Sequence, residues 1–298
     1  MIRNALNAAL PAVLLCAVIV GCGSAIEADN ETVNTPDIKS PSEKSDGATP
    51  ALNLEAPTVD DGASSVAVAA PKPDPEPDKP ADIAALKKLG IEYDTDAYGR
   101  VTEINFRKKK ATDEALALIK RFQQLEVLNL DKTGISNAQL SGVKDFGKLT
   151  SLSLEENAIT DDGLAHLKTL KGLEVLSLTK TRVTGKGLHN LRGLTNLRVL
   201  NLSFCNIGDG GLQYLTDMKL LETLGLQKAN LKGSGLKHIG KLKNMITLNL
   251  DNSSIEGLSL LHLRPCQKLR IIYLRDSFVS KRSVNKLEQI VPSLAIFQ

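Results

Sequence analysis

The chain has 298 residues, a formal net charge of +3 and only 3% aromatic residues, with no tryptophan. The small net charge hides an asymmetry: residues 23–80 carry 12 acidic and 4 basic side chains, whereas residues 81–298 carry 22 acidic and 32 basic ones. The scarcity of rings argues against a single-stranded nucleic-acid binder, which stacks bases on aromatic side chains. The basic C-terminal part, which follows an acidic segment, favours an anionic binding partner.

An apolar run from Ala8 to Val20 follows Arg3 and ends at Gly21-Cys22. The run is too short to span a bilayer and has the layout of a secretory signal. Ile19-Val20-Gly21-Cys22 closely resembles the bacterial lipobox. The resemblance implies cleavage of a lipoprotein signal peptide over residues 1–21 and lipid attachment at Cys22. The mature protein would then be exported and anchored to a bacterial membrane, with the outer membrane favoured by Gly23. A plain cleaved signal and an uncleaved anchor stay open as alternatives.

Residues 22–80 are rich in Pro, Ser, Ala, Asp and Glu and lack periodic apolar residues, which predicts a disordered acidic Pro-rich tether. Residues 81–100 are predicted to form an N-terminal cap over the open end of the region that starts at residue 101. Their apolar residues have helical spacing, Gly90 supplies a stop, and Asp94–Gly99 predicts a hairpin turn. A calcium loop at this turn is excluded because Tyr98 stands where a third ligand is needed.

The pattern Leu-x-x-Leu-x-Leu, with Val or Met as occasional substitutes, then recurs at a constant spacing of 24 residues. Within one unit, Leu152 and Leu154 alternate as in a strand, and Leu164 and Leu167 recur as on a short helix. Each unit is therefore strand, turn and helix, and residues 101–298 are predicted to form a solenoid of eight units plus a truncated ninth strand. The eight copies begin at Val101, Leu125, Leu149, Leu173, Leu197, Leu221, Met245 and Leu269.

The unit resembles the leucine-rich-repeat motif Leu-x-x-Leu-x-Leu-x-x-Asn/Cys-x-Leu, as in the copies that contain Asn157 and Cys205. The resemblance implies an α/β horseshoe with a parallel β-sheet on the concave face and short helices on the convex face. It also implies that the Asn side chain bonds loop backbone. Ala229 and Lys109 stand at the same position in other copies, so we expect less rigid loops there.

The concave sheet is the predicted functional surface, because strand side chains that do not enter the core point into the hollow. With no tryptophan and one tyrosine, this floor predicts modest or distributed affinity. The alternative is that small polar residues are simply what a solvated sheet tolerates. The candidate contacts are Asn129, Asp131, Glu155, Asn201, Phe204, Gln227, Asn249, Asp251, Tyr273 and Arg275.

A second candidate surface is a basic rim just past the strands, with Glu156 and Asp276 interrupting it. It predicts a site for an anionic glycan or other envelope polymer, against the alternative of a merely solvated edge. The rim comprises Arg107, Lys108, Lys109, Lys110, Lys132, Lys180 and Lys228.

Signatures of chemistry are missing from the sequence. There is no Cys-x-x-Cys pair, no His-Glu-x-x-His and no Gly-rich phosphate loop with its Lys. Cys16 lies in the signal, and Cys205 and Cys266 are two repeats apart, too far for a disulfide, so both are predicted to be buried free thiols. We expect no catalytic residue, metal or cofactor. The function predicted is a membrane-anchored, non-enzymatic binding protein that recognises a protein or peptide in the cell envelope or outside the cell. The alternative is an adaptor for an anionic cell-wall or envelope polymer; nucleic acid is not favoured as a partner.

Overall fold

The computed structural model describes residues 76–291 and 293–298. The predicted signal peptide, Cys22 and most of the predicted tether lie outside these residues. Within the described ranges, no helix is both long enough and apolar enough to cross a membrane.

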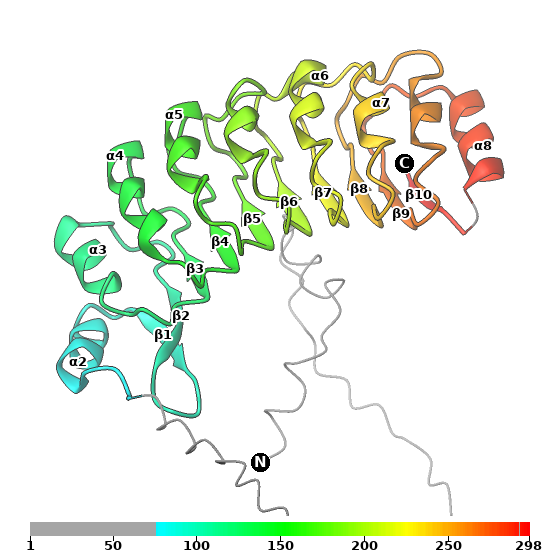
Figure 1. Ribbon diagram of the computed structural model, residues 1–298. Helices are drawn as coiled ribbons and strands as arrows, with labels where there is room; N and C mark the ends of the chain where they lie inside the picture. Colours follow the sequence, from blue (N-terminus) through cyan, green and yellow to red (C-terminus); the bar gives the residue numbers. More distant parts are fainter. Residues whose placement is uncertain (1–75, 292) are drawn as a thin grey trace, which may run out of the picture. The chain divides into compact units, whose positions relative to one another are not determined.

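The described chain is built on one ten-stranded sheet whose strands follow the order of the sequence (Figure 1). β1 pairs with β2 antiparallel, and each later neighbour pair through β10 is parallel. The predicted α/β solenoid is therefore confirmed. The strands are β1 Glu92–Thr95, β2 Val101–Asn105, β3 Val127–Asn129, β4 Ser151–Ser153, β5 Val175–Ser177, β6 Val199–Asn201, β7 Thr223–Gly225, β8 Thr247–Asn249, β9 Ile271–Tyr273 and β10 Ala295–Phe297.

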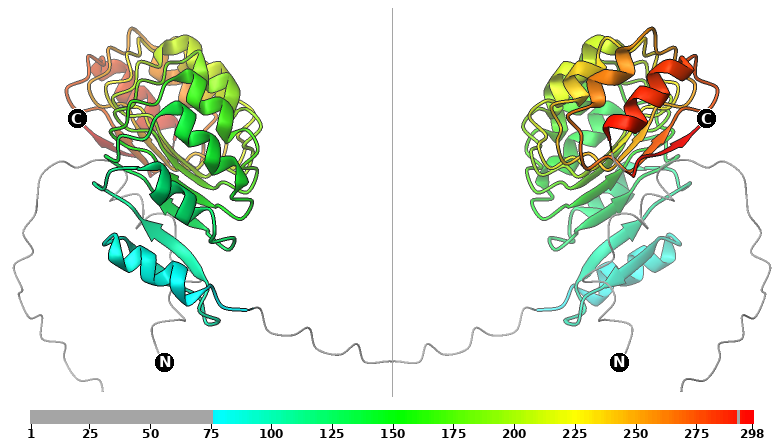
Figure 2. Two further views of the ribbon diagram at one scale, coloured as in Figure 1. Left: turned by 90° about the vertical axis from the view of Figure 1, so that its left-hand side faces the viewer. Right: turned by 90° about the vertical axis from the view of Figure 1, so that its right-hand side faces the viewer.

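Short helical segments line the side of the solenoid opposite the strands (Figures 1 and 2). In three units a single turn of α-helix continues directly as 3-10 helix (η), which suits the three-residue spacing of the leucines. They are α3 Asp113–Ile119, α4 Asn137–Leu140, η1 Ser141–Asp145, α5 Asp161–Leu164, η2 Ala165–Leu167, η3 Gly187–Leu191, α6 Gly208–Gly211, η4 Leu212–Leu215, α7 Leu236–Ile239 and η5 Ser259–Leu263.

The hydrophobic core is continuous between the strand and helix layers. The central residue of a strand, such as Leu152, and the helix residues Leu164 and Leu167 of the same unit are fully buried. A single unit cannot bury these apolar side chains by itself. The core therefore forms only when neighbouring units stack.

A helix and a hairpin cover the first repeat. α2 (Pro80–Lys88) begins with a proline at its first turn, where the missing N–H costs nothing, and it buries Leu86 completely. Gly90 follows it with φ +64°, a left-handed conformation that favours glycine. In the turn between β1 and β2, the Asp96 carboxylate accepts the N–H groups of Tyr98 and Arg100, each at 3.0 Å.

The cap begins earlier than the predicted boundary after residue 80. Asp78 accepts the N–H of Val101 at 2.6 Å, so it is tied to the first residue of β2. The proline-rich composition that predicted tether here is also what a helix start allows, because Pro80 opens α2.

At the other end, α8 (Lys281–Ile290) buries Val284 and Leu287, and β10 continues the sheet beside β9. β10 is the truncated ninth strand that the sequence predicts at the register of the eight earlier ones.

The loop position of the Asn/Cys motif behaves differently from repeat to repeat. Asn157 Oδ1 accepts the N–H of Gly134 at 2.9 Å, and its Nδ2 donates to the carbonyls of Leu130 and Leu154 at 2.8 and 3.0 Å. Ala229 has no such group, and the loop there places the next residue, Asn230, at φ +59°. Asn tolerates this conformation better than most residues.

Candidate functional site

The open face of the sheet is formed by the first and third residues of the three-residue strands β3 to β10, and by Glu103 and Asn105 of β2. Strand registers place equivalent residues of successive repeats directly beside one another, as in Asn249 beside Tyr273 and Tyr273 beside Phe297. Gly225 occupies this register in β7, where a Cβ would collide with the Asn201 side chain. The candidate floor therefore exists as a regular array with one gap at Gly225.

The side chains of the Asn residues at the third strand position accept hydrogen bonds from backbone N–H groups. The Oδ1 atom accepts the N–H two residues ahead: Asp131 bonds to Asn129 at 2.9 Å, Ser203 to Asn201 at 3.1 Å and Asp251 to Asn249 at 2.8 Å. This side-chain turn fixes the exit of the chain from the strand. The geometry gives these three Asn residues a structural role, and ligand contact by them stays a prediction.

Asp131 and Asp251 connect neighbouring repeats. Asp131 Oδ1 accepts the N–H of Glu155 at 2.8 Å, and Asp251 Oδ1 accepts the N–H of Arg275 at 2.8 Å. Both carboxylates are buried, 5% and 1% exposed, so they do not stand out from the floor as the free hydrogen-bonding groups that strand alternation predicts. Their acceptor oxygens bridge the 24-residue interval along the stack, and their role in recognition stays a prediction.

Glu155 is half-buried on the floor beside Asp131. Burial raises the pKa of this carboxyl above its ordinary value of 4.5; the hydrogen bond from Ser177 Oγ at 2.7 Å opposes that rise, and the charge of Asp131 adds to it. The guanidinium of Arg107 lowers the pKa to a smaller extent. Glu155 is thus a floor group whose charged state is disfavoured by its surroundings.

The C-terminal end of the floor gathers aromatic rings and an arginine. Tyr273 and Phe297 stack with ring centroids 5.1 Å apart, and the Arg275 guanidinium lies 5.3 Å from the Tyr273 ring centre. Arg275 also forms an ion pair with Asp251 at 2.9 Å. Tyr and Arg are residue types that dominate binding energy at interfaces. Phe297 was missed as a site residue, although its spacing of 24 residues from Tyr273 was the available signal.

Four residues of the predicted rim, Lys108, Lys132, Lys180 and Lys228, lie on a row of left-handed residues. Eight residues at 24-residue intervals adopt φ between 52° and 62°: Lys108, Lys132, Glu156, Lys180, Phe204, Lys228, Asn252 and Asp276. Because each sits at the same place after its strand, their side chains are neighbours along the stack.

Part of this row is paired internally. Glu156 bonds Lys132 and Lys180, each at 3.1 Å, and these cations hold the Glu156 pKa below its usual range. The ammonium groups of Lys180 and Lys228 lie 5.6 and 5.4 Å from the centre of the Phe204 ring, a cation–π distance. Glu156 thus interrupts the basic row, and its single carboxylate offsets part of the charge of the two adjacent lysines. Gln227, half-buried, lies next to the row in sequence.

The N-terminal end of the rim is different. Arg107, Lys108, Lys109 and Lys110 are all exposed, and within the described residues none of them has a carboxylate at ion-pair distance. Positive charge on the rim is thus concentrated at the first repeat.

Cysteine and histidine do not form a reactive site in the part of the chain that the structure describes. Cys205 and Cys266 are buried free thiols, as predicted. Burial raises the pKa of both, that of Cys266 to about 11, which disfavours the reactive thiolate. The four histidines lie in helical segments away from the strands, and no cluster of described residues has the composition of a metal site.

The fold and the open sheet face define a leucine-rich-repeat solenoid. The leucine rich repeat family model matches residues 147–207. Internalin C2 from Listeria monocytogenes is structurally similar, with a TM-score of 0.58 and 23% identity over 73% of this chain and 92% of that chain. A leucine-rich-repeat protein from Leptospira interrogans gives a TM-score of 0.50 and 22% identity over 61% of this chain and 45% of that chain. No curated protein matches the sequence. These likenesses show the fold.

Proposed function

We propose that this protein is a non-enzymatic scaffold that binds a protein or peptide partner in the cell envelope along the concave face of its sheet. The observation that carries the proposal is the cluster of Tyr273, Phe297 and Arg275 at the C-terminal end of the floor. It combines partly exposed rings with a guanidinium on a rigid sheet, which keeps the entropy cost of binding low. The half-buried Phe204 and Gln227 extend this surface toward the middle of the stack.

Site-specific photo-crosslinking in cells tests the proposal. A benzophenone side chain at Gln227, on the floor, is expected to give a discrete adduct, whereas the same group at the exposed helix residue Lys237 gives none. The double variant Tyr273→Ala and Phe297→Ala should abolish the adduct. The matched control is Leu220→Ala, which removes an exposed apolar side chain elsewhere. Equal adducts at Gln227 and Lys237, or an adduct unchanged by the double variant, would contradict the proposal.

The anchor is a separate part of the proposal, supported by the lipobox resemblance at residues 19–22. Lipid on Cys22 would hold the scaffold at a bacterial membrane, with the outer membrane favoured. Metabolic labelling with an alkyne fatty acid should label the wild type and Cys16→Ser but not Cys22→Ser. Labelling that persists in Cys22→Ser would refute the anchor without touching the binding proposal.

The exposed run Arg107–Lys110 supports one alternative, an adaptor for an anionic envelope polymer. Retention of the protein on immobilised polyphosphate would then fall steeply as NaCl rises from about 0.05 to 0.5 M, because salt screens exposed charges. Changing Lys108, Lys109 and Lys110 to Gln should remove retention. The same change at three exposed helix-side lysines, Lys237, Lys241 and Lys243, should leave it. Retention lost equally in both triple variants would indicate general charge and eliminate this alternative.

A further inference from the structure

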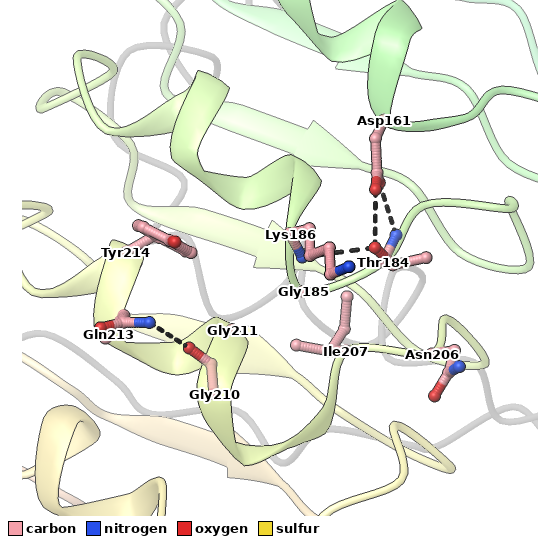
Figure 3. Close-up of a pocket in the computed structure, with 10 residues that line it drawn as sticks. All are labelled: Asp161, Thr184, Gly185, Lys186, Asn206, Ile207, Gly210, Gly211, Gln213 and Tyr214. Atoms are coloured by element: carbon pink, nitrogen blue, oxygen red, sulfur yellow. Dashed lines mark hydrogen bonds between the residues drawn. The ribbon is translucent and has the colours of Figure 1, made fainter.

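A cavity of about 670 Å³ opens on the turn and helix side of the solenoid, away from the strands, between the units that contain η3 and α6 (Figure 3). Its volume lies within the range of small-molecule pockets. The groups that line it include Asp161, Lys186, Asn206, Gly210, Gln213 and Tyr214.

The cavity lies at a break in a regular pattern. Asp161 and Asp209 occupy the same position of their units, and each accepts backbone N–H groups from the turn of the next unit: Thr184 N at 2.7 Å and Gly233 N at 3.0 Å, respectively. Gly185 holds this position in the unit between them. A Cβ on Gly185 would collide with the carbonyl of Ile207, so no side chain fits there. The turn that starts α6 therefore receives no carboxylate, and the cavity lies beside this close approach of the two turns.

The polar groups in the cavity are balanced in charge. The two oxygens of Asp161 accept the N–H and the hydroxyl of Thr184 at 2.7 and 2.6 Å, while Lys186 supplies one exposed cation. Gln213 donates an N–H of its side-chain amide to the carbonyl of Gly210 at 2.9 Å. Its Oε1 atom is the acceptor that it offers to a ligand. Asn206 uses its Oδ1 to accept from Asn230 at 3.1 Å, leaving its amide N–H groups as donors. The lining thus offers both donors and acceptors, with one carboxylate, Asp161, and one ammonium group, Lys186.

Tyr214 adds the apolar component. Its half-buried ring comes from η4, and the His189 ring contacts it edge-on with centroids 6.2 Å apart. In Figure 3 the ring and Gln213 lie at one end of the cavity and the pair Asp161–Thr184 at the other, with Lys186 between them. An aromatic face beside amide, hydroxyl and ammonium groups matches a ligand with a C–H face and a rim of hydroxyls.

We propose that this cavity binds a neutral saccharide. The aromatic ring would cover a pyranose face, and the hydroxyls would donate to Gln213 and accept from Asn206 and Lys186. This site is independent of the concave face, so it adds a ligand class to the proposed scaffold without depending on it.

The test uses the full-length protein with glucose, N-acetylglucosamine and maltose as neutral probes. Saturation-transfer NMR and titration calorimetry should show saturable binding of at least one probe with a Kd of about 1 mM, as suits an open, shallow site. Tyr214→Ala should weaken binding at least about tenfold. No saturable binding by any neutral probe up to about 20 mM would overturn the proposal.

A cavity-filling variant guards against misfolding as an explanation. Gly210 lines the cavity, and a Cβ there would meet no other atom within 4 Å, so Gly210→Phe should place a ring in the space without displacing backbone. Gly147, where a Cβ also meets nothing within 4 Å, provides the matched control Gly147→Phe far from the cavity. Binding should be lost in Gly210→Phe and kept in Gly147→Phe. Binding kept in both, or tighter binding of glucuronate than of every neutral probe, would refute a neutral-saccharide site.

Discussion

At the scale of single residues, the repeat interfaces depend on a few buried polar side chains. Asn157 is 4% exposed, and its removal would leave the Gly134 N–H and two carbonyls without their partner. We expect Asn157→Ala to lower the free energy of unfolding by about 2–4 kcal/mol, because several buried groups lose their hydrogen bonds together. Urea denaturation followed by circular dichroism measures the change.

Ser253 offers the opposite case at the equivalent position of a later repeat. Within the described residues its buried Oγ has no hydrogen-bond partner, whereas Ser277 Oγ donates to the Leu250 carbonyl at 2.8 Å. Ser253→Ala should therefore change stability by less than about 0.5 kcal/mol or increase it, and Ser277→Ala should cost about 1 kcal/mol. Equal losses in the two variants would show that Ser253 has a partner that the geometry does not reveal.

Glu155 predicts a pH effect with a defined sign. Its pKa is raised by burial, so the folded chain binds this proton more tightly than the unfolded chain does. Its favourable contribution is then present below the ordinary value of 4.5 and is lost as the pH rises through the higher folded value. Glu155→Gln should thus be more stable than the wild type at pH 7, with the advantage shrinking toward pH 4. Denaturation at both pH values, with exposed Glu288→Gln as control, decides whether the effect belongs to this site.

At the scale of elements, α2 should act as a cap whose loss is felt locally. Leu86 is completely buried against the first repeat, and Leu86→Ala should cost about 2–5 kcal/mol there. Because each unit touches only its neighbours, we expect faster hydrogen exchange in β2 and unchanged exchange in β8. Leu89→Ala, at a residue that is 47% exposed, is the matched control. A uniform rise in exchange along the stack would contradict local capping.

The positions of strands and helices are what the sequence predicts best. Spacing alone placed Leu152, Leu164 and their equivalents in strand and helix, because burial of one face imposes its period on the chain. The pairing of Glu156 with two lysines and the stacking of Phe297 on Tyr273 follow from the same 24-residue register. The backbone bonds of Asp131 and Asp251 do not, because strand alternation says which way a side chain points but not which N–H groups meet it. The cavity beside Gly185 depends on how closely two turns approach, which composition does not encode.

At the scale of the whole molecule, the described solenoid should tolerate the loss of an entire unit. Deleting residues 173–196 brings β4 beside β6 in the same register. The Asp161 side chain now packs against Gly187; after the deletion it would pack against Gly211, which occupies the same position one unit later. We expect a folded protein with unchanged circular dichroism per residue and a smaller denaturant m-value, because less surface is buried.

Deleting only residues 173–184 provides the control for that experiment. Half a unit joins helix to helix and shifts every later leucine out of its layer, so this variant should unfold or aggregate. If both deletions fold equally well, stacking in a fixed register is not what holds the molecule together. If neither folds, cooperativity extends beyond nearest neighbours, and the local response expected at Leu86 would fail with it.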